Sequence, residues 1–484
     1  MYIDVALKEH SIETPDPLVL YNRLAQHLGR DQVYLLENHH MGNHSAITGQ
    51  IGYGRLLLVS VHEHAIVIEG KPKIVSFLAR NVFAHGQFLD GRLTLRGKDA
   101  APWKILRETQ RAFRVCGVPE KHFRFGFFGY MGYESVHFVE ELPWNGQAAD
   151  DCPIMALGVY AHTIRFTAGV ETARHCVSSS EFWDTPVFEP DSGLPSEHPQ
   201  PVAEPPSPHE IRFTSNEDAY AEGVQKALRH IAMGDIYQVQ LGHSIVIRSD
   251  ITPLEVYRRL RARCASPYMY LAFIGGRCLV GASPESFITV RDGVISMRPL
   301  AGTAPRGETA EDDEFLCEQL LSDPKENAEH IMLVDLCRND LSRICKSDSL
   351  KVEELMTVER HSHVMHLVSH VCAESQENVD VYDQIQATFP AGTMSGAPKI
   401  RAMEIIADIE TTRRNAYAGA VGIIDFDGHA DLALCIRTAI FDGHEYTIRA
   451  SAGVVADSDP SREWKETLHK MGSTYWAITG RELQ

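Results

Sequence analysis

Helical spacing of apolar residues marks a segment near the start of the chain. Leu20, Leu24 and Leu28 recur every four positions, which places them on one face of a helix. Asp16 precedes them and can cap the first turn, while Gly29 follows them and is typical of a helix end. The pattern therefore predicts a helix between Asp16 and Gly29.

A second helix is predicted near the middle of the chain. Ser215 stands where a capping hydroxyl is expected, and Gly234 follows the last apolar position. The apolar residues at helical spacing are Tyr220, Val224, Ala227 and Ile231. The segment therefore reads as an amphipathic helix with a glycine stop.

Strand-type patterns are interleaved with helical ones. The segments that read as strands are 33–37, 56–68, 236–247, 268–274 and 286–290. Asp-Gly pairs, which favour tight hairpins, occur at 292–293, 427–428 and 442–443. Hairpins join antiparallel strands, so we predict an α+β fold with mainly antiparallel pairing and no regular βαβ alternation.

Proline is concentrated in one short segment. Eight of the 24 prolines fall between Pro186 and Pro208, which indicates a linker or long surface loop. We therefore predict an N-terminal α+β region over 1–185, a proline-rich connection over 186–208 and a larger domain over 209–484.

Composition and charge exclude several classes of protein. Lys and Arg total 46 against 65 Asp and Glu, a formal charge of −19 over 484 residues. This balance argues against a non-specific nucleic-acid binder and against charge-driven membrane binding. No run approaches the roughly 20 apolar residues of a membrane span, and no secretory signal is visible. Ten scattered cysteines without a C-x-x-C pair suggest reduced thiols, so we expect a cytoplasmic protein.

Two carboxylate pairs have the spacing of one helix face. Glu326 and Glu329 form the first pair, and Glu463 and Glu466 form the second. Magnesium prefers hard oxygen ligands, and two such helices facing each other could hold Mg²⁺ for an anionic substrate. A solvated helix face, supported by a Glu466–Lys470 pair, is the competing interpretation of the spacing alone.

A turn rich in glycine and hydroxyl groups covers residues 390–399. It combines bare backbone N–H groups, two hydroxyls and Lys399, and could cradle a carboxylate or phosphate. The spacing is not that of a Walker loop, and an ordinary strand-to-helix turn is an equal alternative.

Four histidines lie close together in the sequence. They are His361, His363, His366 and His370. A zinc site is conceivable, but no Glu stands between His366 and His370 in the H-E-x-x-H manner. A proton carrier is the better interpretation, because an unperturbed His titrates near neutral pH.

Seven longer motifs occur in order between residues 212 and 480. They are Gly-Asp-Ile-Tyr-Gln-Val at 234–239, Gly-Ala-Ser-Pro-Glu at 281–285, Arg-Pro-Leu-Ala-Gly-Thr at 298–303, Glu-His-Ile-Met-Leu-Val-Asp-Leu at 329–336, His-Val-Met-His-Leu-Val at 363–368, Thr-Phe-Pro-Ala-Gly-Thr at 388–393 and Ala-Asp-Ser-Asp-Pro at 456–460. Together they resemble the chorismate-utilising enzymes, in particular the anthranilate synthase component I family. The resemblance implies two orthogonal antiparallel β-sheets packed as a sandwich with helices outside, and a requirement for chorismate and Mg²⁺.

The resemblance also implies roles for individual residues. Glu329 and Glu466 resemble direct metal ligands, and Glu326 and Glu463 resemble their indirect partners. Glu285 resembles the general acid that protonates the C4 hydroxyl of chorismate. The residues that resemble substrate contacts are Tyr417, Arg437 and Gly453 at the enolpyruvyl carboxylate, and Lys470 near the metal and the ring carboxylate. Thr303 and His366 resemble catalytic residues near the ring and the departing enolpyruvyl group, and His366 resembles the histidine linked to pyruvate elimination.

Two positions separate branches of the family. Relatives that use water carry a lysine base where this chain has Gln238, and an amide cannot act as a base near neutral pH. Some aminodeoxychorismate synthases carry a nucleophilic lysine where this chain has Ala301. Direct addition of ammonia at C2 is therefore expected. Gln240 stands where relatives often have Val.

The resemblance predicts an ammonia-dependent lyase that converts chorismate to anthranilate and pyruvate, as in tryptophan biosynthesis. Release of the intermediate 2-amino-2-deoxyisochorismate, or formation of aminodeoxychorismate, stays open as an alternative. No Gly-x-Cys-x-Gly elbow is present, so a glutamine amidotransferase small subunit is expected to supply ammonia in trans. Asn38 replaces the serine of tryptophan-regulated relatives, which favours an enzyme insensitive to tryptophan.

Overall fold

The computed structural model describes residues 1–13, 16–39, 47–97, 101–117, 123–144, 152–167, 170–184, 203–360 and 364–483. The α-helices of this part are α1 (Pro17–Leu28), α2 (Pro72–Asn81), α3 (Pro102–Arg111), α4 (Glu217–Ala232), α5 (Pro253–Arg263), α6 (Ala310–Ser322), α7 (Pro324–Ser342), α8 (Val381–Thr388), α9 (Lys399–Ile409) and α10 (Pro460–Thr479). Short 3₁₀ turns are η1 (Arg30–Gln32), η3 (Tyr133–Phe138) and η4 (Gly392–Met394).

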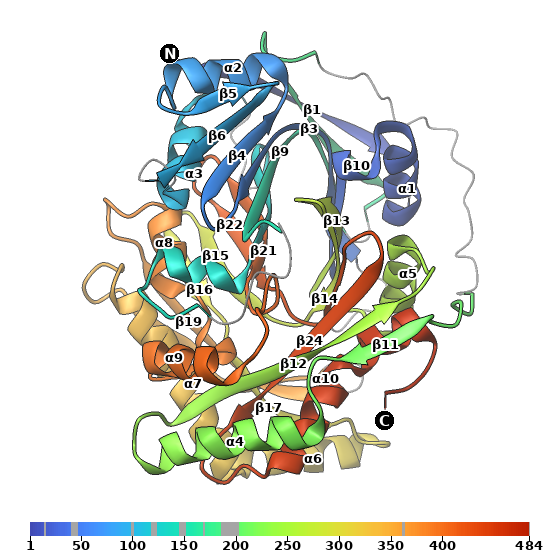
Figure 1. Cartoon of the computed structure of the whole chain (residues 1–484), viewed down its shortest axis with the longest axis vertical. Coiled ribbons are helices and arrows are strands. Elements are labelled where there is room, and N and C mark those ends of the chain that lie inside the picture. Colours follow the sequence, from blue (N-terminus) through green and yellow to red (C-terminus); the bar gives the residue numbers. More distant parts are fainter. Residues whose placement is uncertain are drawn as a thin grey trace.

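The strands form two curved sheets that share two long strands, β3 (Ile47–Val61) and β9 (Met155–Phe166) (Figure 1). From β9, the first sheet continues through β10 (Thr172–Ser179) and β1 (Ile3–Glu13) to β7 (Phe113–Cys116). From β3, it continues through β2 (Val33–His39), β13 (Tyr268–Ile274), β14 (Arg277–Ser283), β23 (Thr438–Phe441), β24 (Glu445–Val454) and β12 (Gln238–Arg248), which also pairs with β11 (Glu210–Phe213) and β20 (Gly396–Ala397).

The second sheet leaves the same shared strands in other directions. On one side β3 pairs with β4 (Ala65–Gly70), then β6 (Arg92–Arg96) and β5 (Gln87–Leu89). On the other, β9 pairs with β8 (Gly126–Met131), then β21 (Ala420–Asp425), β22 (Ala430–Leu434), β15 (Ser286–Arg291), β16 (Val294–Met297) and β19 (Val364–Glu374), which is flanked by β17 (Leu300–Pro305) and β18 (Lys351–Arg360). The shared strands bend where the register shifts between Arg55 and Leu57.

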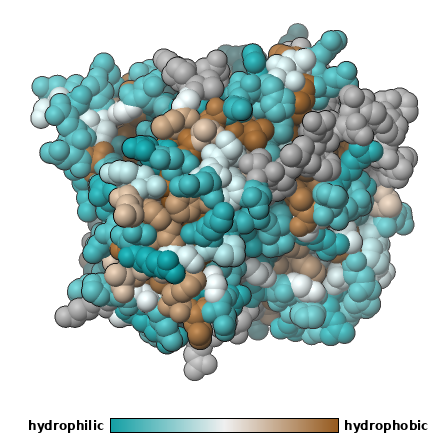
Figure 2. All heavy atoms as spheres, turned by 90° about the horizontal axis from the view of Figure 1, so that it is seen from above, coloured by the Kyte–Doolittle hydropathy of each residue, from teal (hydrophilic) through white to brown (hydrophobic). Residues whose placement is uncertain are grey.

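The core between the two sheets is aromatic. Tyr34 of β2 stacks on Phe128 of β8 with ring centroids 3.7 Å apart, and Tyr270 of β13 belongs to the same buried cluster. Helices α1, α5 and α10 cover the outer face of the first sheet, while α2, α3 and α8 pack on the second. Seen from above, the molecule is mostly hydrophilic, with apolar residues visible in the gaps (Figure 2). The predicted α+β class, with an antiparallel sandwich and helices outside, is confirmed.

Most of the predicted elements are present with small shifts. Asp16 caps α1 by accepting hydrogen bonds from two backbone N–H groups. Helix α4 is capped by Asn216, so the prediction of Ser215 as the cap was wrong by one residue. The Asp-Gly pairs connect β15 to β16, β21 to β22 and β23 to β24, as hairpin chemistry predicts.

One local prediction needs correction. The segment 56–68 is not one strand: β3 ends at Val61, and a turn leads into β4 at Ala65. The alternation continued across the turn because both strands face the same core. A helical H-E-x-x-H type arrangement is also excluded for His366 and His370, because both lie on strand β19, four positions apart and on the same face.

The N-terminal and C-terminal parts share one network of strands. β2 pairs with β13, and β8 pairs with β21, so two strand pairs among the described residues cross the predicted boundary. Residues 185–202, most of the proline-rich segment, lie outside the described residues. The predicted division of the chain into domains stays a prediction. None of the described helices combines the length and apolar character needed to cross a bilayer.

Candidate active site

The predicted site residues come from both sheets and from two outer helices. Glu285 lies between β14 and β15, Gln238 begins β12 and Gly453 is near the end of β24. Thr303 and His366 are cross-strand partners on β17 and β19. Helix α7 carries Glu326 and Glu329, and helix α10 carries Glu463, Glu466 and Lys470.

Glu285 is a buried carboxyl group without an ion-pair partner among the described residues. Its side chain is almost fully enclosed, and burial raises its pKa to about 8. The Thr393 hydroxyl, the backbone N–H of Leu300 and the more distant Lys470 charge lower the pKa only in part. A carboxyl group with this pKa carries a proton at neutral pH and can act as a general acid.

The four carboxylates of α7 and α10 face one another. Burial raises the pKa of Glu329, and the negative charges of Glu326, Glu466 and Glu463 raise it further. Burial also raises the pKa of Glu463, again with a contribution from Glu466. Repulsion within a half-buried group of carboxylates is relieved when a cation binds among them.

This donor set fits magnesium by its chemistry. All four side chains offer hard oxygen ligands, and neither His nor Cys stands among these predicted ligands. As the side chains are placed, no three His, Cys, Asp or Glu groups in the described ranges lie close enough together to surround a metal ion. Lys470 forms an ion pair with Glu466 at 2.6 Å, so one predicted ligand is held by a neighbouring cation.

Ser451 connects several predicted substrate contacts. Its backbone carbonyl accepts a hydrogen bond from Lys470 Nζ at 3.0 Å, and its hydroxyl lies 2.7 Å from the Tyr417 hydroxyl. Arg437 donates to the backbone carbonyl of Lys470 at 2.9 Å, and burial lowers the pKa of Arg437. Tyr417, Arg437 and Lys470 are thus brought together, and their roles toward a substrate stay predictions.

The orientation of His366 is set by its neighbours. Its Nδ1 lies 3.2 Å from the carbonyl oxygen of Gly302 and 3.1 Å from the Thr303 hydroxyl. A carbonyl oxygen can only accept, so Nδ1 carries the proton. In the neutral ring, Nε2 therefore holds the lone pair and can accept a proton.

Gln238 has a buried acceptor with no hydrogen-bond partner in the described part of the chain, its Oε1. Its Nε2 lies 2.7 Å from where a Cβ on Gly453 would be, so a side chain at position 453 would displace it. Ala301 lies on β17, and it offers no nucleophilic atom to this site. Gly453, which has no side chain, thus leaves room for the carboxamide of Gln238 at the site.

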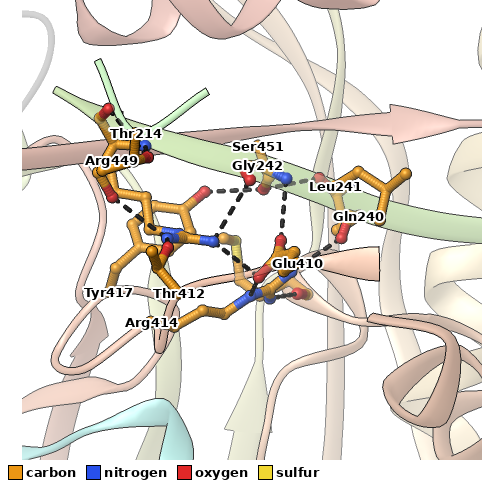
Figure 3. A network of polar contacts seen from close by, with 12 residues as sticks. Thr214, Gln240, Leu241, Gly242, Glu410, Thr412, Arg414, Tyr417, Arg449 and Ser451 are labelled. Atoms are coloured by element: carbon orange, nitrogen blue, oxygen red, sulfur yellow. Dashed lines mark hydrogen bonds and ion pairs between the residues drawn. The ribbon is translucent and has the colours of Figure 1, made fainter. Parts of the chain in front are cut away.

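A buried ionic network supports the strands beside these residues (Figure 3). Glu410 pairs with Arg414 at 2.8 Å and with Arg449 at 2.7 Å. Burial alone would raise the pKa of Glu410, but the two guanidinium groups outweigh it and lower the pKa. Glu410 also accepts the backbone N–H of Gly242 at 2.9 Å, which fixes strand β12.

Sequence reasoning missed the residues that act through hydrogen bonds. Neither Ser451 nor the Glu410 network was among the predicted site residues. The i,i+4 spacing of Glu410 and Arg414 was the available signal, but the same spacing is common on exposed helices. His370 contacts Glu353 at 3.1 Å, while His361 and His363 lie outside the described residues, so the zinc hypothesis gains no support here.

The residue directly before Asn38 on β2 is another buried carboxyl group. Glu37 is fully buried on β2, pairs with Arg261 at 2.9 Å and accepts a hydrogen bond from Tyr257. Residues 40–46, which follow Asn38 and His39, lie outside the described residues. Insensitivity to tryptophan therefore stays a prediction.

Known proteins resemble this chain, some along nearly its whole length and others along about half of it. The 2-amino-4-deoxychorismate synthase of Streptomyces globisporus is 42% identical over 99% of this chain and 98% of its own length. Anthranilate synthase component 1 of Aquifex aeolicus (strain VF5) is 48% identical over 55% of this chain and 53% of its own length. The crystal structure of anthranilate synthase component I from Streptococcus pneumoniae TIGR4 has a TM-score of 0.72 and 28% identity, covering 91% of this chain and 92% of that one. The family model described as chorismate binding enzyme matches residues 63–475, and the chain belongs to that family.

Proposed function

We propose that this protein is the synthase subunit that adds ammonia to C2 of chorismate with loss of the C4 hydroxyl, and that it releases 2-amino-4-deoxychorismate. By its connectivity this is the compound also called 2-amino-2-deoxyisochorismate. The observation that carries the proposal is Glu285, a buried carboxyl group whose pKa of about 8 keeps it protonated. The reaction needs a proton donor at the C4 hydroxyl, because hydroxide is a poor leaving group.

The nucleophile is ammonia rather than water. The amide of Gln238 cannot remove a proton from water, but its unpartnered, buried Oε1 can accept a hydrogen bond from the N–H of ammonia. Ammonia has its own lone pair and needs no base to attack carbon. It loses one proton after the C2–N bond forms, which leaves the product as a neutral amine.

The anionic ends of chorismate are bound by separate groups. Arg437 and the backbone near Gly453 hold the enolpyruvyl carboxylate, with Tyr417 beside it, and Lys470 lies near the ring carboxylate. Glu329 and Glu466, assisted by Glu326 and Glu463, would hold Mg²⁺. When bound there, the ion supplies a positive charge that orients the ring carboxylate and acts as a Lewis acid.

The choice of product rests on the extent of the similarity. The Streptomyces globisporus synthase is 42% identical over 99% of the chain, whereas anthranilate synthase component 1 of Acinetobacter calcoaceticus is 34% identical over 97% of it. The higher identity over the full length favours retention of the enolpyruvyl group, which the sequence alone had ranked second.

Anthranilate is the second candidate product. The arrangement of His366 favours it, because a neutral ring with its lone pair on Nε2 can take a proton during the elimination of pyruvate. Either product requires the same first step and the same ammonia supply. We propose that a separate glutamine amidotransferase delivers ammonia, since the sequence lacks the Gly-x-Cys-x-Gly elbow.

The test incubates the purified full-length chain with chorismate, Mg²⁺ and an ammonium salt. Consumption of chorismate without pyruvate, and without the fluorescence of anthranilate, is expected. One pyruvate per chorismate would replace the first product with the second. No consumption in ammonium, with or without Mg²⁺, would refute the proposed function.

Two controls sharpen this test. Glutamine should not replace ammonium unless an amidotransferase subunit is added. Binding of Mg²⁺ should also be measured directly by calorimetry, where Glu329→Gln is expected to weaken it by tenfold or more, because a charged ligand is lost. Equal binding by this variant would remove Glu329 from the metal site.

A further inference from the structure

Gln240 is placed to control the hydroxyl groups beside the substrate. It lies on β12 directly opposite Gly453 on β24. Its Oε1 accepts a hydrogen bond from the Ser451 hydroxyl at 3.0 Å, and the same hydroxyl lies 2.7 Å from the hydroxyl of Tyr417 (Figure 3). Three polar side chains thus form a chain that ends at a proposed substrate contact.

Counting protons fixes the direction of the two hydrogen bonds that join Gln240, Ser451 and Tyr417. A carbonyl oxygen only accepts, so the single proton of Ser451 points to Gln240. The short contact between Ser451 and Tyr417 must then be donated by Tyr417. In this arrangement Tyr417 can still accept a hydrogen bond from the substrate but has no proton left to donate to it. An apolar residue at position 240 would free Ser451 to donate to Tyr417, which could then donate to a carboxylate.

The Nε2 atom of Gln240 supplies a different donor. It lies 3.0 Å from the position that a Cβ on Gly453 would occupy, beside the Nε2 of Gln238 at 2.7 Å. Two carboxamide N–H groups therefore converge above a residue that has no side chain. They offer neutral hydrogen-bond donors where the enolpyruvyl carboxylate is proposed to bind.

The backbone of Gln240 is held firmly in place. Arg414 donates to its carbonyl oxygen at 2.8 Å, and Glu410 accepts the N–H of Gly242 two residues further along β12. Arg414 and Glu410 are both fully buried and paired with each other. The backbone from which the Gln240 side chain projects is therefore held by the ionic network shown in Figure 3.

We propose that Gln240 is a specificity-determining residue: it turns the Tyr417–Ser451 chain so that Tyr417 cannot donate to the enolpyruvyl group, and it binds that group through its own amide N–H. This inference rests on the proposed function of the site. Its chemical consequence is retention of the enolpyruvyl group in the product.

The consequence follows from the steps of elimination. Loss of pyruvate from the amino product removes the proton on C2, breaks the bond between C3 and the ether oxygen, and leaves the electron pair on that oxygen. The resulting pyruvate enolate must then take up a proton. A Tyr417 hydroxyl that donates toward the enolpyruvyl group would stabilise this charge as it forms, whereas one that only accepts does not.

Two variants at position 240 separate the two parts of the proposal. Gln240→Val removes the acceptor of Ser451 and frees Tyr417, so the ratio of pyruvate released to chorismate consumed should rise about tenfold or more. Gln240→Glu keeps an acceptor for Ser451 but replaces the N–H donor with a negative charge, so the KM for chorismate should rise roughly tenfold or more.

A matched control variant lies outside the site. Gln50 is another buried glutamine on a strand, and its Nε2 donates to the hydroxyl of Tyr34 at 2.8 Å. Gln50→Val should leave both the product ratio and the KM of the folded enzyme unchanged. If it changed them as the Gln240 variants do, the effects would reflect general loss of packing and the proposal would fall.

The outcomes separate this inference from the proposed function. An unchanged pyruvate ratio in Gln240→Val overturns the role in specificity, and an unchanged KM in Gln240→Glu overturns the role in binding. If the wild type itself releases one pyruvate per chorismate, the proposed product is wrong and the specificity role falls with it. If ammonium gives no turnover at all, the dissociation constant of chorismate, measured by calorimetry with Gln240→Glu, decides the binding role alone.

Discussion

Two buried carboxyl groups in this protein have pKa values that are shifted in opposite directions. Glu285 is enclosed without an ion-pair partner among the described residues, and its pKa rises to about 8. Glu410 is at least as deeply buried, but Arg414 and Arg449 contact it and lower its pKa. Burial is therefore common to both, and the presence of a cation decides whether the group keeps a proton or a charge. The protonated Glu285 can donate a proton, whereas the ion-paired Glu410 holds strands in position.

The largest expected effect tests the chemical side of this comparison. Glu285→Gln removes the transferable proton but keeps the shape and neutrality of the side chain. The kcat for consumption of chorismate should fall by about 10²–10⁴-fold, with no loss of thermal stability. The measurement is chorismate absorbance over time, with the melting temperature as the control. A variant that retains near-normal kcat would show that the proton comes from elsewhere.

The structural side of the comparison is tested by Glu410→Gln. This change leaves two guanidinium groups buried without their carboxylate, and the free energy of unfolding should fall by about 3–5 kcal/mol. Urea unfolding of the purified chain measures the loss. Glu482→Gln provides a matched control, because Glu482 pairs with Arg263 at 2.7 Å with both side chains exposed, and its loss should cost much less. Equal losses would mean that burial of the Glu410 pair has no special weight.

A smaller effect concerns pH. Since Glu285 acts as an acid, kcat/KM at constant free ammonia should fall about tenfold per unit above its pKa of about 8. The folded pKa lies above the ordinary value of 4.5, so the stability that this group contributes is fully present below about 4.5 and is lost as the pH rises to about 8. Glu285→Gln should abolish that pH dependence of stability, and a variant with the unaltered slope would contradict the assignment.

The smallest expected effect involves a third buried carboxyl. Glu37 lies between the two extremes, because burial raises its pKa although Arg261 and Tyr257 contact it. Together with Asn38 in place of serine, this arrangement leads us to expect that low micromolar tryptophan leaves the ammonium-dependent rate within about twofold of the control. Inhibition in that range would show a working regulatory site in the N-terminal half.

Local chemistry predicted much of the fold but not its long-range pairing. Asp16 and the Asp-Gly hairpins act within a few residues, so a sequence pattern reveals them directly. The pairing of β2 with β13 joins residues more than 200 positions apart, and no local pattern encodes it. The strand predicted over 56–68 failed for a related reason, since alternation reports which face is buried but not where the chain turns.

The site could be predicted only through the resemblance to a family. The quoted motifs carry Glu285, Gln238 and Glu329, and in the structure Glu329 lies close enough to Glu466 and Glu463 on α10 for their charges to raise its pKa. Ser451 was missed because a serine has no distinctive spacing, and its role depends on a hydroxyl proton that is assigned only when its neighbours are known. Hydrogen-bond direction is a property of a group of residues and cannot be found in any one of them.

The pairing of β8 with β21 and of β2 with β13 also bears on recombination between relatives. The proline-rich stretch at 186–208 looks like a natural crossover point for building chimeras. A crossover there would join strand edges from two parents at both pairs, and would place Glu134 of one parent against Arg414 of the other, where a backbone N–H now binds it at 2.8 Å. Functional chimeras should therefore come from parents whose residues match in these two strand pairs, or from exchanges confined to the outer helices.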